Sequence, residues 1–443
     1  MSLLPLDVIS RAIAEADPLP LTGTVIRAAG LVLEAALPRV AVGTACEIRA
    51  SDGTCVLAEV VGFFGQTARL MPLSDIHGVG EGCAVVPRAA ADRIAVGDGL
   101  LGRVVDAALR PMDGGPLPLL RTRARLHAVP PVAMERRRVT RPQALGIRCI
   151  DACLTVGEGQ RLGIMAGPGV GKSVLLGMLA RSADADVVVV GLVGERGREV
   201  REFIERDLGD GLRRAVVVVA TSDESPLKRV RAAMVATTVA EHFRSQGKRV
   251  LLLVDSLSRV AQAQREIGLA AGEPPTTKGY PPSSFALLPR LVERAGNDAG
   301  PGSITAFYSV LAEGDDQTDP IADAAKATLD GHIVLSRKLA ESGHFPAVDV
   351  LASISRVMSD IVDPNHRELA RQAREVLSAH REAADLVEVG AYVAGTNPRV
   401  DRALRCIHAL QAFLRQGPAE RSELSATLAA LKRALGAQEA PRA

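Results

Sequence analysis

The sequence is poor in aromatic side chains and has no tryptophan. Phe, Tyr and Trp together make up 2% of its 443 residues. Proteins that bind single-stranded nucleic acid rely on aromatic rings that stack on successive bases. A basic surplus is lacking too, because 53 Lys and Arg stand against 51 Asp and Glu. Since a dedicated nucleic-acid binder usually carries such a surplus, we expect no nucleic-acid partner.

Long apolar runs are also absent. No stretch approaches the roughly 18–20 apolar residues that cross a bilayer. The first residues, Met1–Arg11, lack the basic region and apolar core of a secretory signal. A cytoplasmic protein is expected.

Cysteine is scarce, with six residues and no Cys-x-x-Cys pair. Cys149 and Cys153 would share a face if their segment is helical, but their neighbourhood offers no further metal ligands. Buried thiols in a reducing compartment are the better interpretation, and no metal site is expected from them.

The remaining composition, 47% apolar and 23% charged, is that of a globular protein with two or three cores. Residues 21–90 carry short strands that favour a small β-barrel. Residues 91–144, rich in Gly, Pro and Arg, indicate a connector without a core. Residues 145–360 alternate continuous apolar strands with helices, which predicts a parallel sheet covered by helices. Residues 361–443 predict helices only. Residues 1–20 predict a helix that either packs on its own domain or docks a partner.

A phosphate-binding loop joins the strand ending at Ala166 to the helix beginning near Val174. Its glycines let successive backbone N–H groups point at phosphate oxygens, and the helix N-terminus adds partial positive charge. Lys172 is expected to reach the β- and γ-phosphates of ATP or GTP, and the Ser173 hydroxyl to bind Mg²⁺. The nucleotide-binding residues predicted here are Gly167, Gly169, Val170, Gly171, Lys172, Ser173 and Val174.

Two carboxylates follow other apolar strands. Asp255 ends the run from Val250 to Val254 and suits the second magnesium contact, although it would also cap the next helix. Glu195 follows the run ending at Val193 and suits a base that orients the attacking water. Taken alone, Glu195 would be a solvated turn residue.

Hydrolysis also requires positive charge at the transferring phosphate, often from an arginine of a neighbouring subunit. With 53 basic residues, physical reasoning does not select one. Arg356 and Arg337 are candidates, each with a structural role as the alternative.

Five segments together resemble the type III secretion ATPases, which serve bacterial flagella and injectisomes and are related to the α and β subunits of rotary ATP synthases. The resemblance covers nearly the whole chain. The segments are Gly194–Phe203, Ala263–Pro275, Gly279–Pro282, Leu329–Arg337 and Gly343–Asp349.

This resemblance implies a RecA-like core between the barrel and the helical domain, and a homohexamer with ATP bound between subunits. It also implies that Glu195 is the catalytic glutamate, that Arg356 is the arginine finger and that Phe345 stacks on adenine. Many relatives have Tyr at this last position, and Phe keeps the ring face. With Lys172, Glu195 and Arg356 form the expected catalytic set.

The resemblance implies partners as well. The loop Gly272–Pro282 would face the ring channel and a central stalk protein, with a plain surface loop as the alternative. Residues 1–20 would bind a stator-like regulator, and the C-terminal helices would meet export chaperones and substrates. The protein would then act at the cytoplasmic face of the inner membrane, peripheral to the export gate.

The leading hypothesis is an ATPase motor that releases chaperones and unfolds export substrates. Similarities at 156–163, 220–223 and 246–252 favour an injectisome over a flagellar export system. A non-catalytic subunit like the ATP synthase α subunit and a Rho-like nucleic-acid motor are the alternatives.

Overall fold

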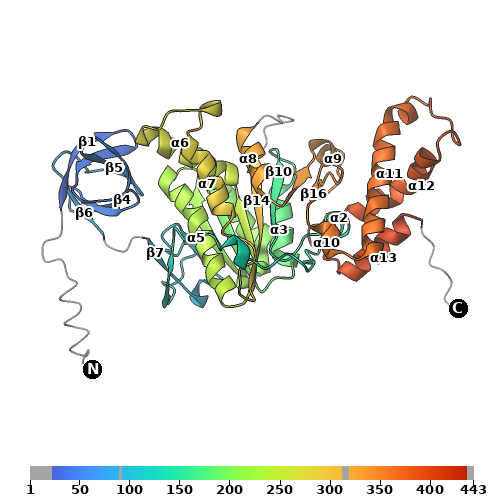
Figure 1. Ribbon diagram of the computed structural model, residues 1–443, viewed down its shortest axis with the longest axis horizontal. Coiled ribbons are helices and arrows are strands. Elements are labelled where there is room, and N and C mark those ends of the chain that lie inside the picture. The colour runs from blue at the N-terminus through green and yellow to red at the C-terminus, as the bar shows by residue number, and fades with distance from the viewer. Residues whose placement is uncertain (1–21, 89–91, 312–318, 437–443) are drawn as a thin grey trace, which may run out of the picture. The chain divides into compact units, whose positions relative to one another are not determined.

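The computed structural model describes residues 22–88, 92–311 and 319–436. These residues form two compact units (Figure 1). One contains the segment before Arg93 together with Ile267–Glu273, and the other contains the remainder. The predicted helix of residues 1–20 lies outside the described residues. The expected fold class is confirmed, with a barrel, a largely parallel α/β core and a helical C-terminal part.

The barrel is closed by six antiparallel strands in the order β1-β2-β5-β4-β3-β6. Along β4 buried and more exposed positions alternate, as the two-residue period of a strand requires. Leu33, Ile48, Val60 and Leu70 fill the interior and are fully buried. The strands are β1 Gly23–Ala29, β2 Val32–Ala36, β3 Ala45–Arg49, β4 Cys55–Phe64, β5 Thr67–Pro72 and β6 Ala84–Pro87.

The second unit is built on an eight-stranded sheet in the order β16-β15-β10-β14-β13-β11-β12-β8. All neighbours are parallel except β16, which runs antiparallel to β15. The strands β11, β12 and β13 are rich in Val and Leu and almost wholly buried, because helices cover both faces. The strands are β8 Val104–Asp106, β10 Arg161–Ala166, β11 Val187–Glu195, β12 Ala215–Thr221, β13 Arg249–Asp255, β14 Ser303–Leu311, β15 Gly331–Leu335 and β16 Ile354–Ser355.

The segment expected to be a coreless connector contributes to this sheet. Val104–Asp106 forms the edge strand β8 beside β12, and Leu100 and Val105 are fully buried. Arg93–Val96 (β7) and Thr122–Arg125 (β9) form a separate pair. The expectation was wrong because three- and four-residue strands are too short to show a period between so many glycines and prolines.

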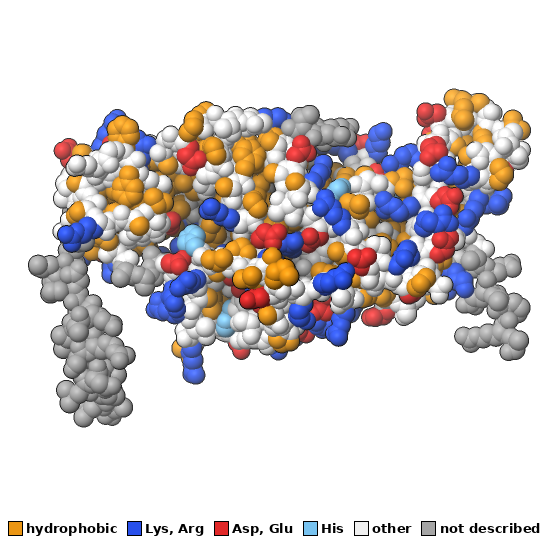
Figure 2. Space-filling view, in the orientation of Figure 1, with side chains coloured by type: hydrophobic (Ala, Val, Ile, Leu, Met, Phe, Trp, Pro, Cys, Tyr) orange, Lys and Arg blue, Asp and Glu red, His pale blue; other side chains and the backbone are white. Residues whose placement is uncertain are grey.

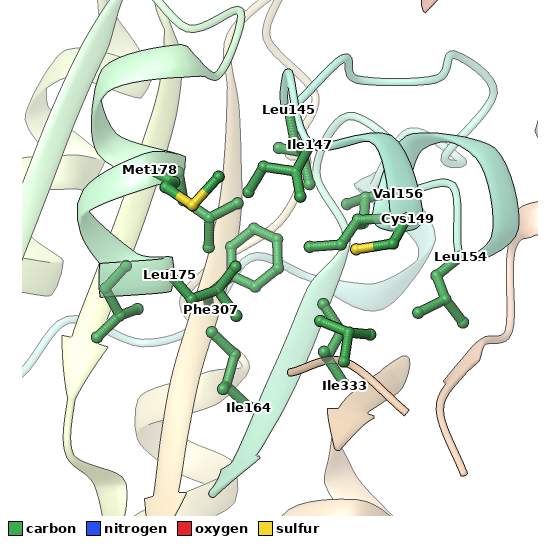
Figure 3. Packing of buried hydrophobic residues seen from close by; sticks show 14 of the residues in the cluster. Leu145, Ile147, Cys149, Leu154, Val156, Ile164, Leu175, Met178, Phe307 and Ile333 are labelled. Carbon is green, nitrogen blue, oxygen red and sulfur yellow. The ribbon is translucent and has the colours of Figure 1, made fainter. Parts of the chain in front are cut away.

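Helices surround the sheet and pack against it to form the core. In Figure 3 the ring of Phe307, from β14, lies among Leu175, Met178 and Ile147. Cys149 is part of the same cluster, and burial raises the pKa of its thiol. The helices of this part are α2 Arg148–Cys153, α3 Lys172–Ser182, α4 Gly197–Glu202, α5 Pro226–Ser245, α6 Leu257–Ala271, α7 Pro282–Val292, α8 Pro320–Thr328, α9 Arg337–Glu341 and α10 Met358–Ile361.

Three helices complete the chain, α11 Pro364–Glu388, α12 Pro398–Leu414 and α13 Leu424–Ala434. Each of the first two has Pro in its first turn and a side-chain cap, Asp363 or Asn397. After the break at Gly417 and Pro418 the sequence predicts a third helix from Ala419, but it starts five residues later, at Leu424. Basic and acidic side chains are interspersed on the face in Figure 2. Among the described residues no helix is both long and apolar enough to span a membrane.

Candidate active site

The phosphate-binding loop lies at the carboxyl end of β10, between β14 and β15. Gly169 and Gly171 have φ values of 76° and 91°, in the left-handed region that glycine adopts without strain. Helix α3 begins directly after the loop, at Lys172, so that its positive end faces the loop. The sequence prediction of strand, loop and helix is therefore confirmed as a structure, with Val170 buried beneath the loop.

Lys172 is the point where the predicted side chains meet. Its Nζ lies 3.3 Å from Glu195 Oε1 and also contacts Asp255 Oδ1. The three side chains are 12%, 15% and 5% exposed, so water screens their charges poorly. Burial lowers the pKa of Lys172, but the two carboxylates outweigh it, and the net pKa is raised. The ammonium is therefore held charged.

Glu195 is the last residue of β11, and a change in strand register immediately precedes it. Gly194 has a φ of 73°, and a Cβ at this residue would lie 2.9 Å from Arg259 Cβ. Burial and the charge of Asp255 raise the pKa of Glu195 to about 6, although Lys172 opposes the shift. A carboxyl group with this pKa is mostly ionised at neutral pH yet readily accepts a proton, which suits a general base.

Asp255 ends β13 and is held from the neighbouring strand. Ser309 Oγ, on β14, donates to Asp255 Oδ1 at 2.5 Å. Ser173 is the second residue of α3 and is half-buried. A hydroxyl and a carboxylate are the hard oxygen donors that Mg²⁺ takes. Two protein donors leave the remaining positions of such an ion to water and phosphate oxygens. Within the described ranges no group of three or more His, Cys, Asp and Glu could hold a metal.

Phe345 lies against the loop. A Cβ on Gly171 would be 3.5 Å from Cδ1 and Cε1 of this ring, which is ordinary van der Waals contact. The side chain remains 44% exposed. The ring therefore borders the loop and keeps surface available for a second flat group.

Arg356 is not brought to this cluster. It follows β16, whose Ser355 pairs with Gly331, the first residue of β15. It therefore lies at the amino end of the parallel strands, whereas Lys172 and its partners lie at the carboxyl end. Five residues of β15 separate the two ends, roughly 16 Å at about 3.3 Å per residue. Arg356 is exposed, and its guanidinium donates to Lys326 O at 3.2 Å.

Arg337, the other candidate, follows β15 at the carboxyl end, next to the strand that leads into the phosphate loop. It is exposed at the start of α9.

Two residues of the site escaped the sequence reasoning. Ser309 is one of several polar residues in the buried strand β14, so the sequence held no signal that would have singled it out. Arg259 packs against Gly194, and its Nε is buried without a hydrogen-bond partner in the described part of the chain. Its signal was its position in the first turn of the helix after Asp255.

Comparison with protein families covers most of the chain with three models. Residues 25–88 match the ATP synthase alpha/beta family, beta-barrel domain, and residues 146–355 match the nucleotide-binding domain of the same family. Residues 362–433 match the T3SS EscN ATPase C-terminal domain.

Relatives of two named kinds are similar over nearly the full length. The flagellum-specific ATP synthase of Pseudomonas aeruginosa is 51% identical over 423 residues, 94% of each chain. The type 3 secretion system ATPase of Sinorhizobium fredii is 49% identical over 414 residues, 93% of this chain and 91% of the relative.

Solved structures agree. The assembled ATPase EscN of the enteropathogenic E. coli type III secretion system has a TM-score of 0.89 and 42% identity, over 93% of this chain and 100% of that one. EscN in complex with its central stalk EscO has a TM-score of 0.86 and 41% identity, with the same coverage. The chain is thus a nucleotide-binding ATPase, and it belongs to the family of flagellum-specific and type III secretion system ATPases.

Proposed function

We propose that this chain is the ATP-hydrolysing motor of a bacterial type III protein export apparatus and works as a homohexamer. Hydrolysis would drive the release of export chaperones and the unfolding of their substrates. The observation that carries the proposal is the contact of Lys172 with both Glu195 and Asp255 at one end of the sheet, with Arg356 at the other end.

Within one site, we assign the phosphate contacts to the loop and Lys172, and the magnesium contacts to Ser173 and Asp255. Mg²⁺, when bound with ATP, neutralises charge on the β- and γ-phosphates. Lys172 would turn from the two carboxylates to the phosphates. Glu195 would then orient a water molecule and accept its proton, as its raised pKa favours. Phe345 would stack on the adenine with its exposed ring surface.

Arg356 is proposed to act on the neighbouring subunit. Its position at the amino end of the strands is far from its own Lys172, so one chain would supply the base of one site and the finger of the next. A ring of identical chains makes every interface equivalent, and each interface would then form one complete site. A non-catalytic subunit would have no need of both Glu195 and Arg356.

The proposed partners follow the same assembly. EscN has been solved with its central stalk EscO, which supports a stalk contact for the loop Gly272–Pro282 in the ring channel. We keep the regulator at residues 1–20, the chaperones and substrates at the C-terminal helices, and a peripheral location at the cytoplasmic face of the export gate as further parts of the proposal.

The export system itself stays a prediction. Relatives named for flagella are 49–52% identical, and those named for type 3 secretion 47–49%, over similar lengths. These sequence identities do not favour the injectisome, which short segments of the sequence predicted, over the flagellar export system. Both alternatives fit equally. Deleting the gene and measuring both swimming and effector secretion would separate the two.

The test of the catalytic assignment is Glu195→Gln. This substitution keeps the shape and one hydrogen bond but cannot accept a proton. We expect unchanged Mg·ATP binding by calorimetry and a loss of turnover of about 10²–10⁴-fold, the usual contribution of a general base. Glu202→Gln is the matched control, since Glu202 lies on α4 and forms an ion pair with the exposed Arg198. Normal turnover in Glu195→Gln would overturn the assignment.

A further inference from the structure

Gln416 connects the C-terminal helices to Phe345. It lies two residues beyond α12 and is only 4% exposed. Its backbone N–H donates to the carbonyl oxygen of Phe345 at 2.9 Å. The aromatic residue beside the phosphate loop is thereby bonded to a segment 71 positions away in the sequence.

The side chain of Gln416 is fully engaged. Its Oε1 accepts from the backbone N–H of Arg148 at 2.8 Å. Its Nε2 donates to the carbonyl oxygens of Gly146 at 2.8 Å and Glu420 at 2.9 Å. A buried amide with both amide hydrogens and its oxygen bonded is fixed in one orientation. The backbone N–H that reaches Phe345 is fixed with it.

The loop after α12 is attached at other points as well. Arg148 contacts the carbonyl oxygen of Arg415, the first residue of this loop, and its Nε donates to Phe413 O in the last turn of α12 at 2.9 Å. Arg181, at the end of α3, donates to Pro418 O at 2.7 Å. Residues at the start of α2 and the end of α3 therefore both hydrogen-bond to this loop. Of these attachments, the one through Gln416 is the one that continues to Phe345.

We propose that Gln416 is a positioning residue that fixes Phe345 for the adenine and links binding of the base to the C-terminal helices. The inference rests on the proposed stacking role of Phe345. Its consequence is selective, because the phosphate contacts belong to the loop, Lys172 and Ser173, none of which Gln416 touches. Losing the Gln416 amide should therefore weaken binding of the base and leave binding of the phosphates intact.

The variant that tests this is Gln416→Leu, which keeps the volume and removes all three side-chain hydrogen bonds. We expect the Kd of Mg·ATP and Mg·ADP to rise about three- to tenfold, the range that an aromatic stacking contact contributes. The Kd of Mg·tripolyphosphate, which has no base, should not change. Calorimetry on the full chain measures all three.

Three variants make the result decisive. Arg181→Ala removes another attachment of the same loop but not the one to Phe345, so it should leave all three Kd values unchanged. Phe345→Ala should repeat the selective loss of ATP and ADP affinity. The double variant of Phe345→Ala with Gln416→Leu should be no weaker than Phe345→Ala alone, because both act through one ring.

The outcomes separate two failures. If Phe345→Ala leaves ATP affinity unchanged, the stacking role itself is wrong. If Phe345→Ala weakens ATP but Gln416→Leu does not, or weakens tripolyphosphate equally, the positioning role is wrong. Equal weakening by Arg181→Ala would mean general loosening of the loop and would also overturn it.

A second measurement covers the case in which Gln416→Leu does not fold. Gln416→Glu retains the acceptor for Arg148 and loses the donors to Gly146 and Glu420. Because the chain has no Trp, Phe345→Trp supplies a single fluorescent reporter at the site. In that background Gln416→Glu should shift the emission and reduce quenching by ATP, and unchanged emission and quenching would contradict the proposal.

Discussion

At the scale of residues, two carboxylates of the site, Glu195 and Asp255, share the single ammonium group of Lys172. Lys172 contacts two buried carboxylates, and it satisfies neither alone, because Asp255 still raises the pKa of Glu195. Ser309 relieves part of the imbalance by donating to Asp255. This neutral hydrogen bond gives Asp255 a partner other than Lys172, whose ammonium group also contacts Glu195.

The raised pKa of Glu195 predicts an acid limb in the pH profile. A carboxyl group accepts the proton of water only when it is ionised, and the pKa of Glu195 is about 6. As pH falls below this value, kcat/KM should fall about tenfold per unit, and from pH 7 upward it should be level. Steady-state hydrolysis from pH 5 to 8 checks this, with ATP affinity measured over the same range. A level profile down to pH 5 would contradict it.

The sequence predicted that the phosphate loop, Glu195 and Asp255 lie together, because this follows from their place along the chain. The glycines before Lys172 mark the loop, and Glu195 and Asp255 follow apolar strands whose carboxyl ends meet at one edge of a parallel sheet. Ser309 and Gln416 could not be predicted in this way. Ser309 bonds to Asp255, 54 positions away. Gln416 bonds to Phe345, 71 positions away, and to Arg148, 268 positions away. Such contacts exist only once strand order and helix docking are known.

At the scale of elements, the end of β11 shows how a strand end places a carboxylate beside the phosphate loop. The register shift between Val193 and Glu195, with the left-handed Gly194 between them, is a local irregularity of the kind that re-aims a side chain. Glu195 still pairs with Thr221 of β12, and its side chain contacts Lys172. The absent side chain of Gly194 also makes room for Arg259 on α6. Two elements were poorly predicted from the sequence. The strand β8 has only three residues, and α13 begins after a loop whose residues hydrogen-bond to Gln416 and Gly146.

This geometry predicts that Gly194→Ala is harmful. An added Cβ would meet Arg259 Cβ at 2.9 Å, and the φ of 73° is strained for alanine. We expect a loss of about 1–3 kcal/mol in the free energy of unfolding and lower turnover, because Glu195 must move. Gly197→Ala is the matched control, since nothing lies within 4 Å of a Cβ there. Denaturant unfolding and ATPase assays measure both, and equal behaviour of the two variants would refute the account.

At the scale of the whole molecule, a single chain holds the residues proposed for two half-sites at opposite ends of its sheet. Lys172, Glu195 and Asp255 lie at the carboxyl end, and Arg356 lies at the amino end. A ring in which each chain faces the next the same way brings unlike ends together at every interface. Lys172→Ala and Arg356→Ala should therefore each abolish turnover, the first in its own site and the second in its neighbour's.

Mixing these two inactive variants should restore activity. An active interface needs Lys172 from one chain and Arg356 from its neighbour. In a mixed ring the Arg356→Ala chain supplies Lys172, and the Lys172→Ala chain supplies Arg356. In randomly mixed rings at equal amounts this holds for about a quarter of interfaces, so up to about a quarter of normal turnover is expected if sites act independently. ATPase assays after the subunits are mixed before assembly measure it, with each variant alone as the control. If the mixture stays inactive although mixed rings form, Arg356 acts within its own chain or only structurally, and the ring is not the catalytic unit.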